Sequence, residues 1–72
     1  MRYDVAQIIR RRLVLGWTKS KVAGKAGVSH TTVSRVEAGE FQSPDTISRI
    51  ARALKLDMED LVIDDDTEPV ER

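Results

Sequence analysis

The chain contains no cysteine and a single histidine among its 72 residues. Without cysteine it can form no disulfide, offer no thiol nucleophile and bind no zinc through thiolates, which agrees with a reducing cytoplasm. His30 follows Ser29 directly, and no third group is spaced to complete a catalytic triad with them. No glycine-rich phosphate loop is present either. We therefore expect a protein that is not an enzyme and that holds no metal ion and no cofactor.

Long apolar runs are absent as well. No window approaches the roughly 20 apolar residues needed to cross a bilayer, and no apolar signal-peptide core follows the first four residues. No segment alternates apolar and polar residues as a half-buried strand does. We expect a soluble, cytoplasmic, all-α protein with no membrane contact, and a single domain because 72 residues leave little room for two.

The formal net charge is zero, but the two signs are segregated along the chain. Residues 1–53 carry ten Lys and Arg against four Asp and Glu, a net charge of +6. Residues 54–72 carry two basic residues against eight acidic ones, a net charge of −6. A basic body of this kind can present a positive face to a polyanion such as DNA.

Capping signals predict five helices, over residues 4–15, 18–25, 29–37, 43–54 and 57–62. Each begins at a residue whose side chain can accept a hydrogen bond from the free N–H groups of a first turn. Glycine follows each of the first three helices, where a left-handed residue commonly ends a helix. Apolar residues repeat at helical spacing, and in the first helix they are Val5, Ile8, Ile9 and Leu13.

The second and third predicted helices are joined by the short segment Ala26-Gly27-Val28. This connection is too tight for two helices to stack antiparallel, and it suits two helices that cross at a steep angle. Ala23 is small enough to let them approach. The sequence therefore predicts a helix-turn-helix unit.

Residues 63–72 lose the helical periodicity and gain acidic residues, so we expect a folded domain over 1–62 and a flexible acidic tail over 63–72. The tail is not a calcium loop, because the chain has no glycine after position 39 for the required turn. Two roles stay open for it. The tail is either a solubilising end, or a segment that meets a protein partner or deters non-specific contact with DNA.

Two charged residues fall on stripes that should face the core. Arg12 lies three and four positions after Ile9 and Ile8, and Glu37 lies four positions after Val33. Burying either charge alone costs several kcal/mol, whereas an arginine and a carboxylate can satisfy each other through two parallel hydrogen bonds. We expect Arg12 and Glu37 to pair, although both could instead flank the core and extend to solvent.

The segment from Leu15 to Gly39, LGWTKSKVAGKAGVSHTTVSRVEAG, resembles the Cro/C1-type helix-turn-helix of the XRE family of transcriptional regulators. The resemblance continues through Pro44, IARAL at residues 50–54 and MEDL at residues 58–61, so it covers nearly all of the predicted folded part. It implies a five-helix, lambda-repressor-like domain that binds operator DNA as a homodimer. It also implies an ion pair at the positions of Arg12 and Glu37.

In this family the third helix enters the major groove and the second lies across the DNA backbone. A helical wheel that turns Val33, Val36 and Glu37 inward leaves a polar face outward, and an ordinary solvated helix face is the alternative interpretation. The candidate base-reading residues on it are His30, Thr31, Ser34 and Arg35. The candidate phosphate-contacting residues are Lys19, Ser20, Lys21, Lys25, Gln42 and Ser43.

The sequence thus predicts a regulator, a repressor in our interpretation, that binds double-stranded DNA as a homodimer. Leu61, Val62 and Ile63 are the candidate dimer contact, unless they close the core of the monomer. An alternative function uses the same fold as an antitoxin-like or anti-regulator module, in which the acidic tail contacts a protein partner.

Overall fold

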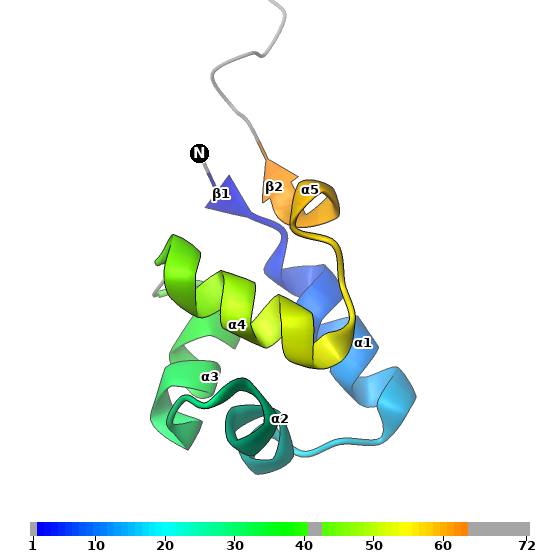
Figure 1. The fold of residues 1–72 in the computed structure, drawn as a ribbon, viewed down its shortest axis with the longest axis vertical. Helices are drawn as coiled ribbons and strands as arrows, with labels where there is room; N and C mark the ends of the chain where they lie inside the picture. The colour runs from blue at the N-terminus through cyan, green and yellow to red at the C-terminus, as the bar shows by residue number, and fades with distance from the viewer. Residues whose placement is uncertain (1, 41–42, 64–72) are drawn as a thin grey trace, which may run out of the picture.

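The computed structural model describes residues 2–40 and 43–63. In that part of the chain five helices and two very short strands follow one another (Figure 1). In chain order they are β1 Arg2–Tyr3, α1 Val5–Leu15, α2 Lys19–Ala26, α3 His30–Glu37, α4 Pro44–Leu54, α5 Met58–Leu61 and β2 Val62–Ile63. The predicted architecture of five helices is confirmed.

Local capping explains where the two central helices begin. The Thr18 hydroxyl accepts a hydrogen bond from the Lys21 N–H, and the Ser29 hydroxyl accepts one from the Thr32 N–H, both at 3.1 Å. Each bond satisfies one of the N–H groups that have no partner within the first turn. Asp4, Ser43 and Asp57 precede their helices as predicted, but their side chains make no such capping bond.

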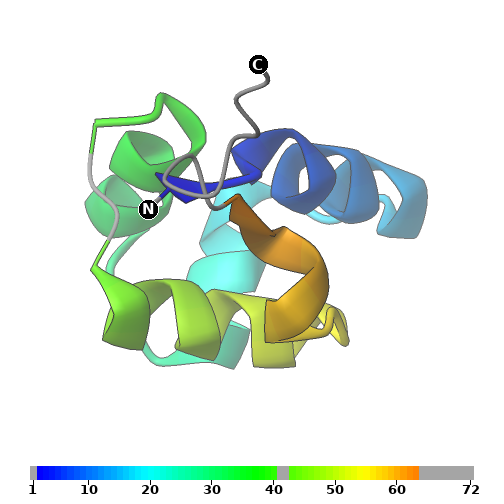
Figure 2. The same ribbon diagram turned by 90° about the horizontal axis from the view of Figure 1, so that it is seen from above.

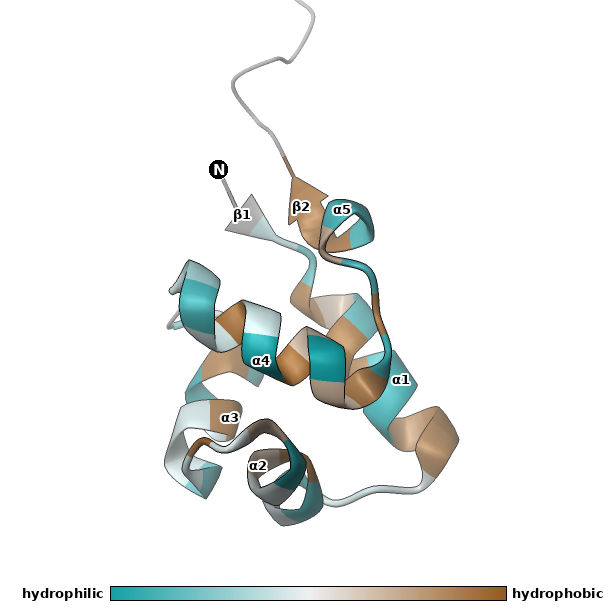
Figure 3. Ribbon diagram, in the orientation of Figure 1, coloured by the Kyte–Doolittle hydropathy of each residue, from teal (hydrophilic) through white to brown (hydrophobic). Residues whose placement is uncertain are grey.

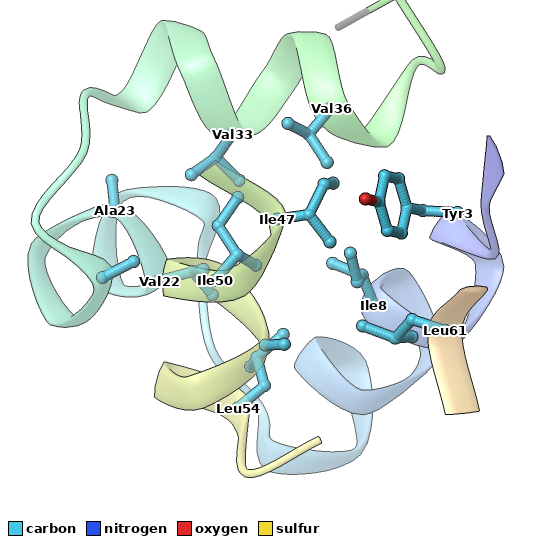
Figure 4. Packing of buried hydrophobic residues seen from close by; sticks show 12 residues of the cluster. Tyr3, Ile8, Val22, Ala23, Val33, Val36, Ile47, Ile50, Leu54 and Leu61 are labelled. Atoms are coloured by element: carbon cyan, nitrogen blue, oxygen red, sulfur yellow. The ribbon is translucent and has the colours of Figure 1, made fainter. Parts of the chain in front are cut away.

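The core lies between the helices, where side chains from every helix meet (Figure 4). α4 contributes most to it, because its apolar residues recur on one face. α1 packs against α3 and α4, and α2 packs against the same two helices. The buried apolar residues are Tyr3, Ile8, Val22, Ala23, Ala26, Val33, Val36, Ile47, Ile50, Ala51, Leu54 and Leu61.

Polar contacts join α1 to the C-terminal part of the fold. The Asp4 N–H donates to the Leu61 carbonyl at 2.7 Å, and Gln7 Nε2 donates to the Asp60 carbonyl at 2.9 Å. Farther along α1, Arg11 Nε donates to the Leu54 carbonyl at 3.0 Å. Seen from above in Figure 2, α5 therefore bridges the space between α1 and α4.

The two strands differ from the prediction, which contained no strand and extended the fifth helix to residue 62. β1 and β2 pair antiparallel, with Arg2 opposite Ile63 and Tyr3 opposite Val62. Strands of two residues are too short to show an alternating pattern, so the sequence carries no signal for them. Ile63, the first residue of the predicted tail, belongs to this ribbon, and residues 64–72 lie outside the described residues.

The end of α1 also differs from the expected apolar stripe. Ile8 is the buried residue of α1, whereas Leu13 is 62% exposed, Val14 72% and Leu15 39%. In Figure 3 the last turn of α1 is brown where it projects beyond the other helices. Its apolar periodicity therefore continues past the part that the core covers. Among the described residues no helix is both long and apolar enough to span a bilayer.

Gly24 lies inside α2, and no atom lies within 4 Å of the place where its Cβ would be. We expect Gly24→Ala to raise the free energy of unfolding by about 0.5–1 kcal/mol, because alanine favours the helix over glycine by this amount. Urea unfolding followed by circular dichroism measures the change. Gly27→Ala is the matched control. Gly27 has a φ of +74°, and we expect this variant to lose about 1–2 kcal/mol. A loss of stability in Gly24→Ala would contradict the open surface around this residue.

Candidate nucleic-acid interface

A tight turn sets the angle between α2 and α3. Gly27 ends α2 in the left-handed region at φ 74°, and the N–H groups of Gly27 and Val28 both donate to the Ala23 carbonyl, at 2.9 and 3.0 Å. Ser29 then caps α3 directly. Ala23 and Ala26 are buried beside this turn, and their small side chains let the two helices approach closely. The arrangement is the predicted helix-turn-helix.

α3 presents two chemically different faces. Val33 and Val36 have no exposed surface and point into the core, as Figure 4 shows. His30, Thr31 and Arg35 are exposed, and Ser34 is half-buried. The four candidate base-reading side chains therefore lie outside the core on one short helix, and their contact with bases stays a prediction.

The predicted pair between Arg12 and Glu37 is present and holds α3 to α1. Arg12 Nε donates to Glu37 Oε2 at 2.7 Å, and Arg12 Nη2 donates to Glu37 Oε1 at 3.0 Å. The side chains are only 13% and 6% exposed, so water screens the pair weakly. The hydrogen bonds to Glu37 raise the pKa of Arg12, against the opposing effect of burial. Arg12 therefore keeps its charge.

Arg12 also connects this pair to the start of the helix-turn-helix. Its Nη1 donates to the Trp17 carbonyl at 3.0 Å, next to the capping residue of α2. One guanidinium thus binds a side chain of α3 and the backbone that leads into α2. The two helices of the motif are fixed to α1 through a single residue, which the sequence could not show.

The lysines of α2 gather around Trp17. Lys21 Nζ lies 5.3 Å from the centre of the indole ring and Lys25 Nζ lies 5.9 Å from it, within the range of cation–π attraction. Lys19 is half-buried and Ser20 is exposed in the first turn of the helix. The candidate phosphate contacts of α2 are therefore not equivalent, because Lys21 and Lys25 already have an aromatic partner.

The remaining candidate contacts lie near the start of α4. Ser43 precedes α4 and is half-buried, with no capping bond from its side chain. Gln42, the other candidate phosphate contact in this loop, lies outside the described residues. The loop position of Ser43 agrees with a backbone contact, which stays a prediction.

Sequence reasoning gave no role to the arginines on the outer face of α4. Arg49 Nε donates to Asp45 Oδ2 at 3.1 Å, but both side chains are exposed, so this pair adds little stability. The i, i+4 spacing of Asp45 and Arg49 was the signal in the sequence that could have predicted this pair. Between α2 and α4 is a hollow of about 380 Å³. It is lined by Lys25, Ala26, Asp45, Ser48, Arg49, Arg52 and Ala53.

The predicted dimer contact requires a correction. Leu61 has no exposed surface, because it packs into the monomer core together with Tyr3 and Ile8. It cannot reach a second copy in this fold. Val62 and Ile63 are half-buried and belong to β2. Only these two residues of the predicted contact retain surface that another molecule could touch.

The comparisons with known proteins agree with this geometry. A family model described as helix-turn-helix matches residues 8–61, three-quarters of the chain. The match runs from Ile8 within α1 to Leu61 at the end of α5, so it covers most of α1 and the whole of the other four helices. A search of curated proteins finds no match.

Within residues 2–40 and 43–63, no group of three or more His, Asp or Glu is placed to hold a metal ion.

Removing one partner of the buried pair should be costly. We expect Glu37→Ala to lower the free energy of unfolding by about 3 kcal/mol, because it leaves the Arg12 charge buried with only the Trp17 carbonyl. Thermal unfolding followed by circular dichroism measures the loss. The double variant Arg12→Met with Glu37→Leu should recover most of the loss, since it removes both charges. Asp45→Ala, which breaks the exposed pair, should change stability by less than about 1 kcal/mol. Equal effects of Glu37→Ala and Asp45→Ala would contradict the importance of burial.

Proposed function

The chain belongs to the XRE family of Cro/C1-type helix-turn-helix DNA-binding regulators, and from this membership we propose that it is a cytoplasmic repressor that binds operator DNA as a homodimer. In this proposal α3 enters the major groove. Its outward side chains contact base edges, and the first turns of α2 and α4 contact the phosphates on either side.

The observation that carries the proposal is the polar outer face of α3, held in place by the pair beneath it. Val33, Val36 and Glu37 fix the rotation of α3 about its own axis. Thr31 and Arg35 are then exposed one turn apart on the free side. An arginine in the major groove can bind guanine O6 and N7 through two donors, and a threonine methyl can pack on thymine.

Phosphate contacts follow from the helix beginnings. The free N–H groups of a first turn and the helix dipole attract anions. α2 adds Lys19 and the exposed Ser20 to this site. Lys21 and Lys25 lie over the Trp17 ring, and in the proposal they attract the DNA backbone more generally.

Selection of bound duplexes from a random DNA pool, followed by a salt titration on the selected sequence, tests the proposal. We expect a defined site and a steep linear decrease of log K with log [salt], with a slope of about −0.9 for each phosphate contact. The absence of enrichment would oppose sequence-specific binding. Binding of a protein partner without any binding of DNA would favour the antitoxin-like alternative, to which the acidic residues outside the described part are proposed to contribute.

Two single substitutions separate base reading from phosphate binding. We expect Arg35→Ala to relax the preference at one base position of the selected site and to cost about 1–3 kcal/mol there. We expect Lys19→Ala to weaken binding to all duplexes about equally and to lower the salt slope by about 1. Fluorescence anisotropy with the selected duplex and its single-base variants measures both. An equal, non-selective loss in the two variants would contradict the proposed role of Arg35.

A further inference from the structure

An apolar strip on the outside of α1 has no cover in the described part of the chain. Ala6, Ile9, Arg10, Leu13 and Val14 line a shallow hollow of about 450 Å³ there. We call these five residues the α1 strip. Four of them are apolar, and Leu13 and Val14 are 62% and 72% exposed. Exposed apolar residues are common singly, whereas these lie next to one another on one helix face.

The neighbours of α1 show which way the strip faces. Successive residues of a helix are turned by about 100°. Arg12 is directed at α3 through Glu37, and Ile9 and Leu13 lie about a quarter turn away from it. Arg11, which donates to the Leu54 carbonyl at the end of α4, lies on nearly the opposite side from Leu13. The strip therefore faces sideways, with α3 to one side of it and α4 behind.

We propose that the α1 strip is the surface through which two copies of this chain associate, with the two α1 helices packed antiparallel. The inference rests on the proposed function of operator binding as a homodimer and names the contact. The two copies are then related by a two-fold axis perpendicular to the plane of the two α1 helices, and each copy uses the same patch for the contact. Because α3 lies to one side of the strip, that axis carries both α3 helices to the same side of the dimer. Two half-sites on one face of DNA require this arrangement.

Charge complementarity favours the antiparallel orientation and a second copy as the occupant. Arg10 has no ion-pair partner among residues 2–40 and 43–63, and on the helical wheel it lies on the same side of the strip as Gln7. Gln7 contacts the Asp60 carbonyl of α5, where Glu59 and Asp60 are exposed. An antiparallel pair brings the C-terminal half of each α1 next to the N-terminal half of the other. Arg10 of one copy then approaches the acidic α5 of the other.

The strip is one helix face wide, so it covers less than the roughly 800 Å² per partner of a standard interface. The dimer should therefore be weak in free solution and should form mainly on DNA, where two half-sites hold the copies together. The proposal therefore makes a specific prediction. A substitution in the α1 strip should weaken binding most on duplexes that have two half-sites.

Single cysteines test the contact directly, because the chain has none of its own. We expect Arg10→Cys, which lies at the middle of the strip and next to the two-fold axis of an antiparallel pair, to form an intermolecular disulfide when an oxidant is added in the presence of a two-half-site duplex, where the Cα atoms of the two copies come within about 7 Å. Non-reducing gel electrophoresis measures it. The matched control is Ile63→Cys in β2, the alternative dimer surface. Cross-linking through Ile63→Cys alone would overturn the proposal in favour of the ribbon.

A polar variant tests the consequence for binding. We expect Leu13→Gln with Val14→Gln to lower the affinity for the two-half-site duplex about tenfold or more, and to leave the affinity for a single half-site within about twofold. Both side chains are mostly exposed, and circular dichroism checks that the fold is retained. Equal losses on both duplexes, or no loss on either, would overturn the contact.

Two further outcomes separate the inference from the proposed function. Retained sequence-specific binding to a single half-site, without cooperativity on two, would overturn the dimer and leave DNA binding intact. Absence of binding to any duplex would overturn the proposed function itself. A chain that ends at Ile63 tests whether residues 64–72 of the same chain, and not a second copy, cover the α1 strip. If removal of residues 64–72 changes the amide shifts of Leu13 and Val14 in the monomer, the acidic segment of the same chain covers the strip, and the proposal is wrong.

Discussion

The Arg12–Glu37 pair is the constraint on which the arrangement of the helix-turn-helix depends. A short helix with two buried valines could rotate or slide on the core, because apolar contacts have no preferred direction. Two parallel hydrogen bonds do have one, and they set both the rotation of α3 and its position along α1. The third bond of Arg12, to the Trp17 carbonyl, extends the same constraint to the start of α2. The polar face of α3 is outward because its other face is fixed in this way.

The sequence predicted most of this fold because local and long-range signals agreed. The caps at Thr18 and Ser29 and the left-handed Gly27 predict the ends of α2 and α3 to within one residue, and the spacing of Val33 and Val36 predicts the buried face of α3. The ion pair was predictable because an isolated charge is too costly on an apolar stripe. Signals of this kind come from the chemistry of one residue and its neighbours in sequence, so they can be recognised without the fold.

What the sequence could not predict depends on which surfaces meet. Leu13 continues the apolar spacing of Val5, Ile8 and Ile9, but the core of the protein ends before it, and only the packed structure shows where. Leu61 was a candidate for an exposed dimer contact but is fully buried, because β1 with Tyr3 packs over it and closes the core. The two-residue ribbon likewise depends on residues that are far apart in the sequence and that no local pattern connects. The candidate base-reading residues can be placed on α3 outside the core, but the partners proposed for them belong to another molecule.

The position of Trp17 has an optical consequence. It is the only tryptophan, and the ammonium groups of Lys21 and Lys25 lie over its ring. An indole excited state is sensitive to nearby charge, so any anion that draws these lysines aside alters the environment of the sole tryptophan emitter. The protein therefore carries an intrinsic fluorophore at the edge of its helix-turn-helix, and occupancy of this surface is open to observation without attaching a dye.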